Sequence, residues 1–508
     1  MKPAIHTLGE LQQSGYKVVG IKEEMRRNVI RMLRANERLF PGIVGFDDTV
    51  IPQIVNAILA KHDILLLGLR GQAKTRIARQ MVNFLDEYTP IVSGSEINDS
   101  PFEPLSAYAR RKHADEGDEM RIDWIHRSER YAEKLATPDV SVADLIGDID
   151  PIKASAQKLS YADEAAIHYG IIPRSNRGIF TINELPDLQP RIQVSLFNIL
   201  QERDVQIRGF NIRMPLDVCL IFTANPEDYT RRGSIITPLK DRIDAQILTH
   251  YPRTLEDGIT ILDENAWVQR EDVANVHVPL FMKQVVESIA SCARSSEYVD
   301  HSSGVSARMT ISVMEALVSN CERRALAAGD KVAVPRMIDF HHALSGVTGK
   351  IELVFEGEQE GLTNIAKALV GKAAREVFTR TFPDPLQKAK RNMDKHPVDP
   401  YAPVMKFFAA GNSINLSDTQ SISGSLAELD KVPTLRTLVS TYLHIDDSNP
   451  ALLVSAMEFV LESLHHHSKI AKDESDGISS YKDMVGSMLR GSYRADDADS
   501  DATDEDLL

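Results

Sequence analysis

Short runs of apolar residues alternate with helical stretches along the first half of the chain. Residues 64–67, Ile-Leu-Leu-Leu, form one such run, which is typical of a parallel strand buried on both faces. Further runs cover residues 90–94, 178–182, 217–225 and 244–250. Because strands that alternate with helices favour a parallel sheet, the pattern predicts an α/β domain with a mainly parallel sheet.

Beyond Pro252 the strand signals fade and amphipathic helical patterns take over. One of them, residues 308–329, closes on Gly329, a residue type common just after a helix C-terminus. Prolines within 381–404 mark a boundary, and further helical patterns follow it. Residues 496–508 carry seven acidic side chains and few apolar ones, which predicts a disordered tail.

Size and charge narrow the class of protein. A chain of 508 residues exceeds what one compact core holds, so about two to four domains are expected. The net charge of −15 argues against non-specific nucleic-acid binding, which needs clustered Lys and Arg. The apolar runs are shorter than the ~20 residues of a membrane span, and residues 1–17 lack the apolar centre of a signal peptide.

The cysteines and histidines suggest neither disulfides nor a metal centre. Cys219, Cys292 and Cys321 are too few and too scattered for a disulfide framework or a zinc site. A reducing cytoplasmic location is therefore expected. Three consecutive histidines, 465–467, would face different directions on a helix, so we expect a solvated helix end there.

The segment GLRGQAKT, residues 68–75, directly follows the apolar run 64–67 and opens a helical stretch. This context is typical of a phosphate-binding loop, in which backbone N–H groups and the helix N-terminus cradle phosphates. Lys74 would reach the β and γ phosphates of ATP, and Thr75 would ligate Mg²⁺. A Gly-containing turn with a surface lysine is the alternative. The expected nucleotide-binding residues are Gly68, Gly71, Gln72, Ala73, Lys74 and Thr75.

Two positions depart from the usual pattern. Ala73 stands where a glycine is common, and it fits if its φ stays negative. The run 178–182 leads into Asn183 and Glu184, where an ATPase normally has two acids. Asn183 offers a carbonyl oxygen to the Mg²⁺ shell but no charge, so it would hold the metal's waters less strongly.

With its loop at 68–75 and TINEL at 181–185, the chain resembles the AAA+ ATPases. Within them it is similar to the branch of the magnesium-chelatase ATPase subunit and the MoxR-like ATPases. The resemblance covers about residues 41–350. Its other motifs are PGIVGFDDTVIPQIVNAIL (41–59), SVADLIGDIDPIKA (141–154), IHYGIIPRSNRGIFTINEL (167–185), LQPRIQVSLFNILQERDVQIRG (188–209), FTANPEDY (222–229), PLKDRID (238–244) and SSGVSARMTIS (302–312).

The resemblance implies roles for four residues. Glu184 would polarise the attacking water, and Asn225 would orient that water or sense the γ-phosphate. Arg242 would act as an arginine finger in the neighbouring subunit's site, and Arg308 would contact the phosphates from a helical lid. Each has a plainer alternative: a turn residue for Asn225, a surface ion pair for Arg242 and a solvated side chain for Arg308.

The implied organisation is an AAA+ α/β nucleotide-binding domain followed by helical regions. The expected boundaries are a leader with a helix at 1–40, the nucleotide-binding domain at 41–255, a helical lid at 256–380, a C-terminal helical region at 381–490 and a disordered tail at 491–508.

The expected function is ATP hydrolysis with Mg²⁺ in a ring, by resemblance a hexamer, that remodels a partner protein. That partner would often carry a von Willebrand A-type domain. Asn183 leaves three readings open: slow hydrolysis, ATP binding used for assembly, or adequate metal binding by Thr75 and the phosphates. We favour hydrolysis at a modest rate, because Lys74, Glu184 and Arg242 are all present.

Three other functions are considered. The chain could be the ATPase subunit of a true magnesium chelatase, or a nucleotide-gated scaffold with little turnover, which only Asn183 supports. A sigma-54-type transcriptional activator ranks lowest, because the GAFTGA loop of those activators is absent from the sequence.

Overall fold

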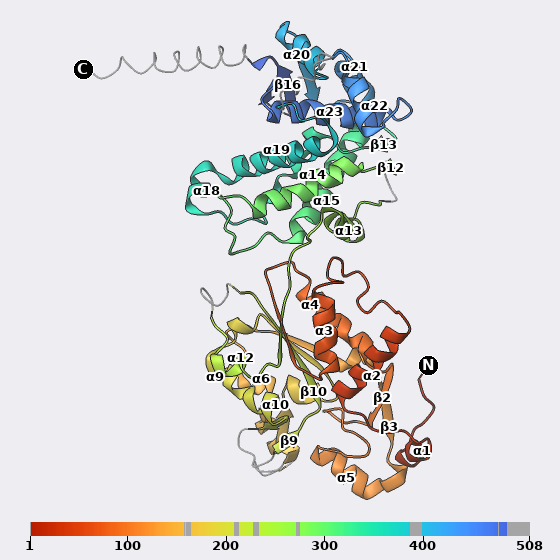
Figure 1. The fold of residues 1–508 in the computed structure, drawn as a ribbon. Helices are drawn as coiled ribbons and strands as arrows, with labels where there is room; N and C mark the ends of the chain where they lie inside the picture. Colours follow the sequence, from red (N-terminus) through yellow and green to blue (C-terminus); the bar gives the residue numbers. More distant parts are fainter. Residues whose placement is uncertain are drawn as a thin grey trace, which may run out of the picture. The chain divides into compact units, whose positions relative to one another are not determined.

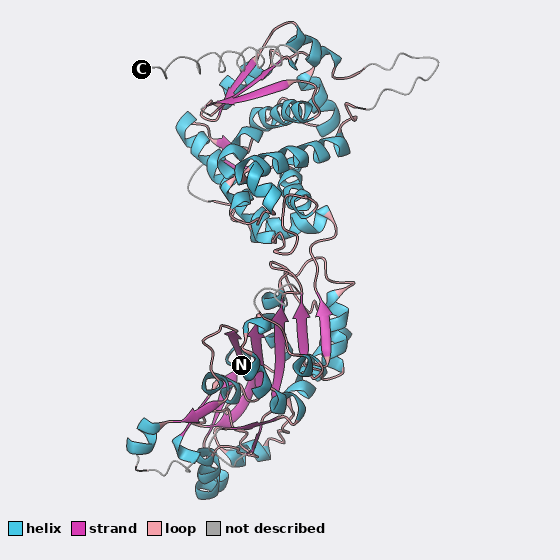
Figure 2. Ribbon diagram, turned by 90° about the vertical axis from the view of Figure 1, so that its left-hand side faces the viewer, coloured by secondary structure: helices cyan, strands magenta, loops and turns pink. Residues whose placement is uncertain are grey.

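The computed structural model describes residues 2–156, 158, 164–207, 213–226, 233–270, 275–386, 399–475 and 477–484. The chain divides into two compact units, Met1–Tyr251 and Pro252–Leu508 (Figures 1 and 2), and each is described by itself. The predicted tail at 491–508 lies outside the described residues. No helix in the described part of the chain combines the length and apolar character needed to cross a bilayer.

The first unit is built on a five-stranded parallel sheet (Figure 2). In spatial order its strands are β11 (Ala245–Leu248), β1 (Ile64–Leu67), β10 (Val218–Ala224), β7 (Gly178–Asn183) and β4 (Tyr131–Leu135). Leu66 on β1 lies opposite Thr223 of β10 and Ile247 of β11. The sheet confirms the predicted α/β class with parallel strands.

Helices cover both faces of this sheet (Figure 1). On β1, Ile64 and Leu66 point into one core and Leu65 and Leu67 into the other, because successive strand residues face opposite sides. The first face packs against α2 (Ile21–Arg34), α3 (Val50–Leu59) and α4 (Lys74–Gln80). The second packs against α9 (Pro190–Ser195), α10 (Phe197–Gln201) and α12 (Thr237–Lys240).

Two strands differ from the sequence expectation. The polar and charged composition of residues 126–147 predicts a surface loop, but this stretch contains β4, the edge strand, which pairs with β7. The run 90–94 was expected to join the parallel sheet. Instead β2 (Tyr88–Val92) pairs antiparallel with β3 (Ile122–His126) in a separate two-stranded sheet.

Shorter elements complete the first unit. The other α-helices in its described residues are α1 (Leu8–Gln13), α5 (Ala107–Glu116), α6 (Val142–Leu145), α7 (Pro151–Ala156) and α8 (Ile171–Arg174). Two more antiparallel pairs are β5 (Gly147–Ile149) with β6 (Ile167–Tyr169), and β8 (Asp204–Gln206) with β9 (Arg213–Pro215). The last pair fits the sequence QERDVQIRGF (201–210), which predicts a turn into a short hairpin and of which residues 208–210 lie outside the described residues.

The second unit is mostly helical. Its longest helices are α14 (Leu280–Arg294), α15 (Ala307–Ala328), α19 (Leu362–Thr381) and α23 (Pro450–His466). The shorter ones are α13 (Leu255–Asn265), α16 (Phe340–Ala343), α17 (Ser345–Thr348), α18 (Phe355–Glu360), α20 (Ala402–Ala409), α21 (Ile422–Leu429) and α22 (Leu435–Leu443). Helix α15 ends as predicted, with Gly329 in the left-handed conformation at φ 72°.

The second unit also contains strands. β14 (Ile414–Ser417), β16 (Ile478–Lys482) and β15 (Ala471–Ser475) form an antiparallel sheet, and β12 (Asn275–Val276) pairs with β13 (Val332–Ala333). One hydrophobic cluster runs from Leu262 to Tyr481. The expected boundary between residues 380 and 381 falls within the stretch of chain that builds this cluster, and it stays a prediction.

All three cysteines are buried and free of disulfides. Cys219 lies on β10, Cys292 on α14 and Cys321 on α15. Burial raises the pKa of the Cys219 and Cys292 thiols to about 12, and it raises the pKa of Cys321 as well. At neutral pH the nucleophilic thiolate is therefore scarce at each of them.

Candidate nucleotide site

The predicted phosphate loop lies between the carboxyl end of β1 and the first turn of α4. Two of its residues adopt the left-handed backbone conformation, Gly71 at φ 75° and Ala73 at φ 55°. The expectation that Ala73 keeps a negative φ is therefore wrong. The turn into α4 needs a positive φ at this position, where a Cβ is unfavourable and glycine would be free of strain.

The start of the loop is closely covered by side chains. Thr249 follows β11, and its hydroxyl donates a hydrogen bond of 2.7 Å to Oε1 of Gln72. A Cβ added at Gly68 would collide with both of these side-chain ends. Gly68 thus leaves room for these two side chains where the loop begins. Gln72 is only 6% exposed and holds the loop against β11 through its bond with Thr249.

Lys74 points back into the loop that precedes it. Its Nζ donates to the backbone oxygen of Gly68, to that of Leu69 at 2.9 Å, and to Oδ1 of Asn225 at 3.2 Å. Asn225 follows the carboxyl end of β10 and is 8% exposed. The structure thus brings together the expected phosphate-binding lysine and the expected γ-phosphate sensor.

Thr75 and the pair Asn183–Glu184 meet at the same edge of the sheet. The Thr75 hydroxyl donates to Oδ1 of Asn183 at 3.3 Å, and the Thr223 hydroxyl donates to the same oxygen at 3.2 Å. Thr223 also accepts a hydrogen bond of 3.1 Å from the backbone N–H of Glu184. Glu184 stands in the left-handed conformation at φ 56°, just after β7 ends, and its side chain is half-buried.

Arg242 lies apart from this group within the first unit. Its guanidinium stacks over the Phe197 ring at 4.6 Å from the centroid and donates to Oε1 of Gln201 and to the backbone oxygen of Pro238. The side chain is half-buried on the surface built by α10 and α12. Among the described residues, these contacts of Arg242 do not include Asp241 or Asp244, the acids of the plainer alternative.

Arg308 belongs to the second unit. It is exposed in the first turn of α15, where its backbone N–H is capped by the Ser306 hydroxyl at 3.1 Å. Its expected contact with the phosphates therefore stays a prediction.

Sequence reasoning missed three residues beside the site. Thr223 bonds to both Asn183 and Glu184, and its signal in the sequence was a polar residue within an apolar run, two residues before Asn225. Glu133 and Arg79 form an ion pair, with Nε of Arg79 3.0 Å from Oε2 of Glu133. They went unnoticed because β4 was taken for a loop, which left Glu133 without a place in the sheet.

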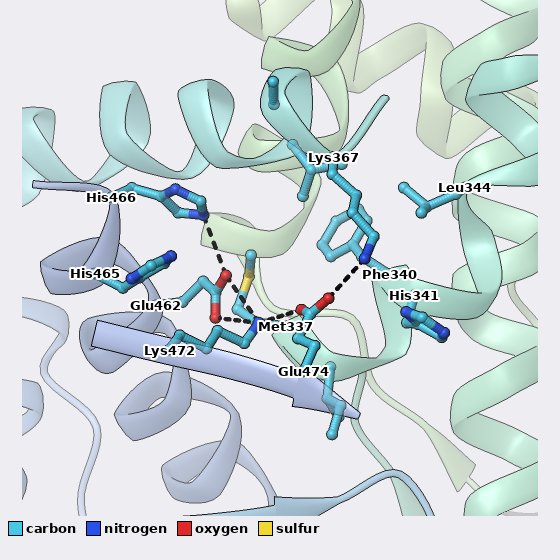
Figure 3. A pocket seen from close by; sticks show the side chains of 13 residues that line it. Met337, Phe340, His341, Leu344, Lys367, Glu462, His465, His466, Lys472 and Glu474 are labelled. Atoms are coloured by element: carbon cyan, nitrogen blue, oxygen red, sulfur yellow. Dashed lines mark hydrogen bonds and ion pairs between the residues drawn. The ribbon is translucent and has the colours of Figure 1, made fainter. Parts of the chain in front are cut away.

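A separate cavity of about 380 Å³ lies in the second unit (Figure 3). Its polar wall is a cluster of ion pairs: Lys472 contacts Glu462 at 2.9 Å and Glu474 at 2.7 Å, and Lys367 contacts Glu474 at 2.8 Å. Burial opposes ionisation of Glu474, but the Lys472 charge lowers the pKa of Glu474 to about 2. These charges neutralise each other, so we interpret the cluster as a structural feature.

Histidines 465 and 466 line this cavity, and His466 lies 3.1 Å from Glu462 (Figure 3). His467 is 2% exposed. The expectation of a solvated helix end is therefore wrong, because α23 packs its last turn into the unit. Among the described residues, no group of three His, Cys, Asp or Glu side chains could hold a metal ion.

Comparison with known proteins shows which proteins the chain is similar to. The family described as "Sigma-54 interaction domain" matches residues 155–247. The chloroplastic magnesium-chelatase subunit ChlI-2 of Arabidopsis thaliana is 26% identical over 232 residues, which cover 45% of this chain and 52% of that protein. The magnesium-chelatase 38 kDa subunit of Rhodobacter capsulatus is 24% identical over 254 residues, or 48% of this chain and 63% of that protein.

The chain thus spans about half to two thirds of the length of the curated relatives it matches. Among solved structures, the BchI–BchD complex of magnesium chelatase matches with 18% identity and a TM-score of 0.33, covering 63% of this chain and 98% of that one. NtrX from Brucella abortus matches with 13% identity and a TM-score of 0.31, covering 61% and 53%. At these TM-scores the structural likeness adds no support.

The likeness rests instead on the sequence relatives, which are magnesium-chelatase subunits. The parallel sheet and the residues gathered at its carboxyl edge agree with the architecture expected from the sequence. The chain is thus similar to the magnesium-chelatase subunits, and its fold fits the AAA+ ATPases that its sequence resembles.

Proposed function

We propose that the chain binds ATP with Mg²⁺ at the carboxyl edge of its sheet and hydrolyses it. The observation that carries the proposal is the convergence of Lys74, Thr75, Asn183 and Asn225, which come from the ends of two neighbouring strands and one helix start yet are joined by hydrogen bonds of 3.2–3.3 Å. Glu184 follows directly, held by Thr223.

The side chains present fit this ligand. The oxygens of Thr75 and Asn183 are the hard donors that Mg²⁺ prefers, and they lie 3.3 Å apart. Lys74 donates to neutral backbone and amide oxygens, which phosphate oxygens can replace with a stronger, charge-assisted bond. Bound Mg²⁺ would neutralise charge on the β and γ phosphates.

The protein's own groups would then divide the work. The N–H groups of the loop and of the start of α4 cradle the phosphates, and Lys74 holds them in place. Glu184 directly follows the end of β7 and is half-buried. It orients a water for in-line attack on the γ-phosphate. Asn225 contacts Lys74 and so lies where it can report the state of the γ-phosphate.

The test is steady-state ATP hydrolysis as a function of Mg²⁺ concentration. Lys74→Ala is expected to abolish ATP binding and turnover, whereas Glu184→Gln should keep binding and lower turnover by about 10²-fold or more. Lys61→Ala, an exposed lysine outside the loop, is the matched control and should leave both unchanged. Tight binding with no wild-type turnover would favour the nucleotide-gated scaffold.

The proposal extends to an assembly of several subunits, as the sequence resemblance implies. In a ring, expected to be a hexamer, Arg242 would reach the neighbouring subunit's nucleotide and Arg308 would contact the phosphates from the lid. The work done would be remodelling of a partner protein, with a von Willebrand A-domain protein as the leading expectation. Support comes from the sequence relatives, which are named as subunits of magnesium chelatase. A cytoplasmic location belongs to the same proposal.

The true magnesium chelatase stays the second candidate, because the curated relatives carry that name. Accumulation of protoporphyrin when the gene is deleted would favour it.

A further inference from the structure

The strand next to Asn183 carries a carboxylate that no part of the proposed mechanism uses. Glu133 lies on β4, opposite Thr181 of β7, and Leu135 lies opposite Asn183. Side chains two residues apart on a strand share a face, so Glu133, Thr181 and Asn183 face the same side of the sheet. Helix α4, which carries Thr75, packs on that side.

Asn183 stands between two different neighbours. On the β10 side, its Oδ1 accepts hydrogen bonds from the Thr75 and Thr223 hydroxyls. Both are donors, so they fix the carbonyl oxygen on that side and turn the amide NH₂ towards β4. Glu133 is the carboxylate on β4 and lies diagonal to Asn183 on the same face of the sheet, where the two side chains interact.

Glu133 is held in place from its other side as well. Arg79, one helical turn after Thr75 on α4, pairs with it, and the Tyr131 hydroxyl donates to its Oε2 at 3.0 Å. The carboxylate is 29% exposed. Glu133 is thus an ionised group on the strand next to Asn183, the position at which the ATPases that this chain resembles have an aspartate.

We propose that Glu133 is a positioning residue for the metal shell: it orients the Asn183 amide and supplies, from the neighbouring strand, the negative charge that Asn183 lacks. This inference rests on the proposed Mg²⁺–ATP site. Asn183 then presents its carbonyl oxygen to Thr75, and Glu133 adds a longer-range attraction for the cation. Arg79 partly offsets that attraction.

The test is calorimetric titration of the full chain with ATP, in EDTA and in Mg²⁺, and the readout is the ratio of the two dissociation constants. Glu133→Gln should lower the Mg²⁺-dependent gain in affinity by about fivefold, as expected for one charge within several Å of the metal in a partly solvated site. Arg79→Gln should raise the gain, because the Glu133 charge is then unopposed.

This pair of variants separates the proposal from a purely structural role. Both substitutions break the same ion pair, so a structural role predicts that both change the Mg²⁺ gain in the same direction, and that result would overturn the proposal. Adding Asn183→Asp to Glu133→Gln returns the charge to β7 and should restore the gain to within about twofold of wild type. An unrestored gain would contradict charge compensation.

Two outcomes keep this inference distinct from the proposed function. If wild type binds no ATP, the nucleotide site itself is wrong and the inference falls with it. If wild type shows a large Mg²⁺ gain that neither Glu133→Gln nor Arg79→Gln changes, the site stands and only the role of Glu133 is overturned. Should Glu133→Gln unfold, the rise expected in Arg79→Gln decides the question alone.

Discussion

Ala73 shows how one residue can carry strain at a binding loop. Its φ of 55° lies in the left-handed region, where an L-residue with a Cβ costs about 1–2 kcal/mol. The neighbouring loop residue with positive φ, Gly71, is a glycine and avoids that cost. The chain therefore accepts a local penalty directly before Lys74, at the point where the loop turns into α4.

Ala73→Gly should relieve this strain. Because glycine also loses more backbone entropy on folding, the net gain in the unfolding free energy of the first unit should be about 0.5–1 kcal/mol. Gly71→Ala, with φ 75°, should destabilise by about 1 kcal/mol. Chemical denaturation of both variants measures these changes. A loss of stability in Ala73→Gly would show that the alanine methyl contributes more by packing than the backbone strain costs.

At the scale of elements, helix α14 carries a buried carboxylate, Glu287. Glu287 is 7% exposed and packs against Gly258 of α13, where an added Cβ would collide with it. Burial raises the pKa of Glu287 from 4.5 to about 7, although the Arg294 charge and a hydrogen bond from Thr310 oppose the rise. The packing of α13 on α14 thus favours the protonated side chain.

The pH dependence follows from the raised pKa. A carboxyl whose pKa is higher in the folded state contributes stability below its unfolded pKa of 4.5, and this contribution is lost as pH rises through about 7. Glu287→Gln removes this titration. The free energy of unfolding of Glu287→Gln minus that of wild type should therefore be larger at about pH 8 than at about pH 4.5, by up to about 3 kcal/mol. Denaturant unfolding of the second unit across this range measures the difference, and a pH-independent difference would contradict it.

Elements also show what could be predicted from the sequence. The strands β1, β7 and β10 were predictable because buried parallel strands are apolar throughout, and they place most of the site. The strand β4 was missed because it lies at the edge of the sheet and pairs with β7 on one side only. Polar residues such as Glu133 and Lys134 are tolerated in such an edge strand. The run at β2 is also apolar, but it pairs with β3 in a separate sheet, and apolar content alone does not reveal which strand is the partner.

The positive φ of Ala73 lay beyond sequence reasoning for another reason. Alanine disfavours that conformation, so its local preference points away from the structure observed. The turn is imposed by β1 and α4, which hold the two ends of the loop. Likewise, the role of Thr223 depends on the register of β10 with β7, and a register is set by long-range pairing.

At the scale of the whole molecule, the proposed ring gives Arg242 a role that one subunit cannot show. Arg242→Ala and Glu184→Gln should each lower turnover strongly as pure proteins. Mixed in equal amounts, they should regain part of the wild-type rate, because some interfaces then join an intact Arg242 to an intact Glu184. ATPase assays at concentrations that allow assembly measure this, with sizing by light scattering. Mixtures no more active than their components would contradict a shared site.

Each of the two units contains at least one buried cysteine, and the labelling rate of that thiol reports how often the unit opens. A thiol reagent needs an exposed thiolate, and Cys219 lies at the centre of the first sheet while Cys292 and Cys321 lie in helices of the second unit. Labelling at each position therefore occurs only when the surrounding structure opens. Mass spectrometry of labelled peptides can follow the opening of the two units separately in the unmodified chain. ATP should slow the labelling of Cys219, because a ligand that binds only the closed unit makes opening rarer.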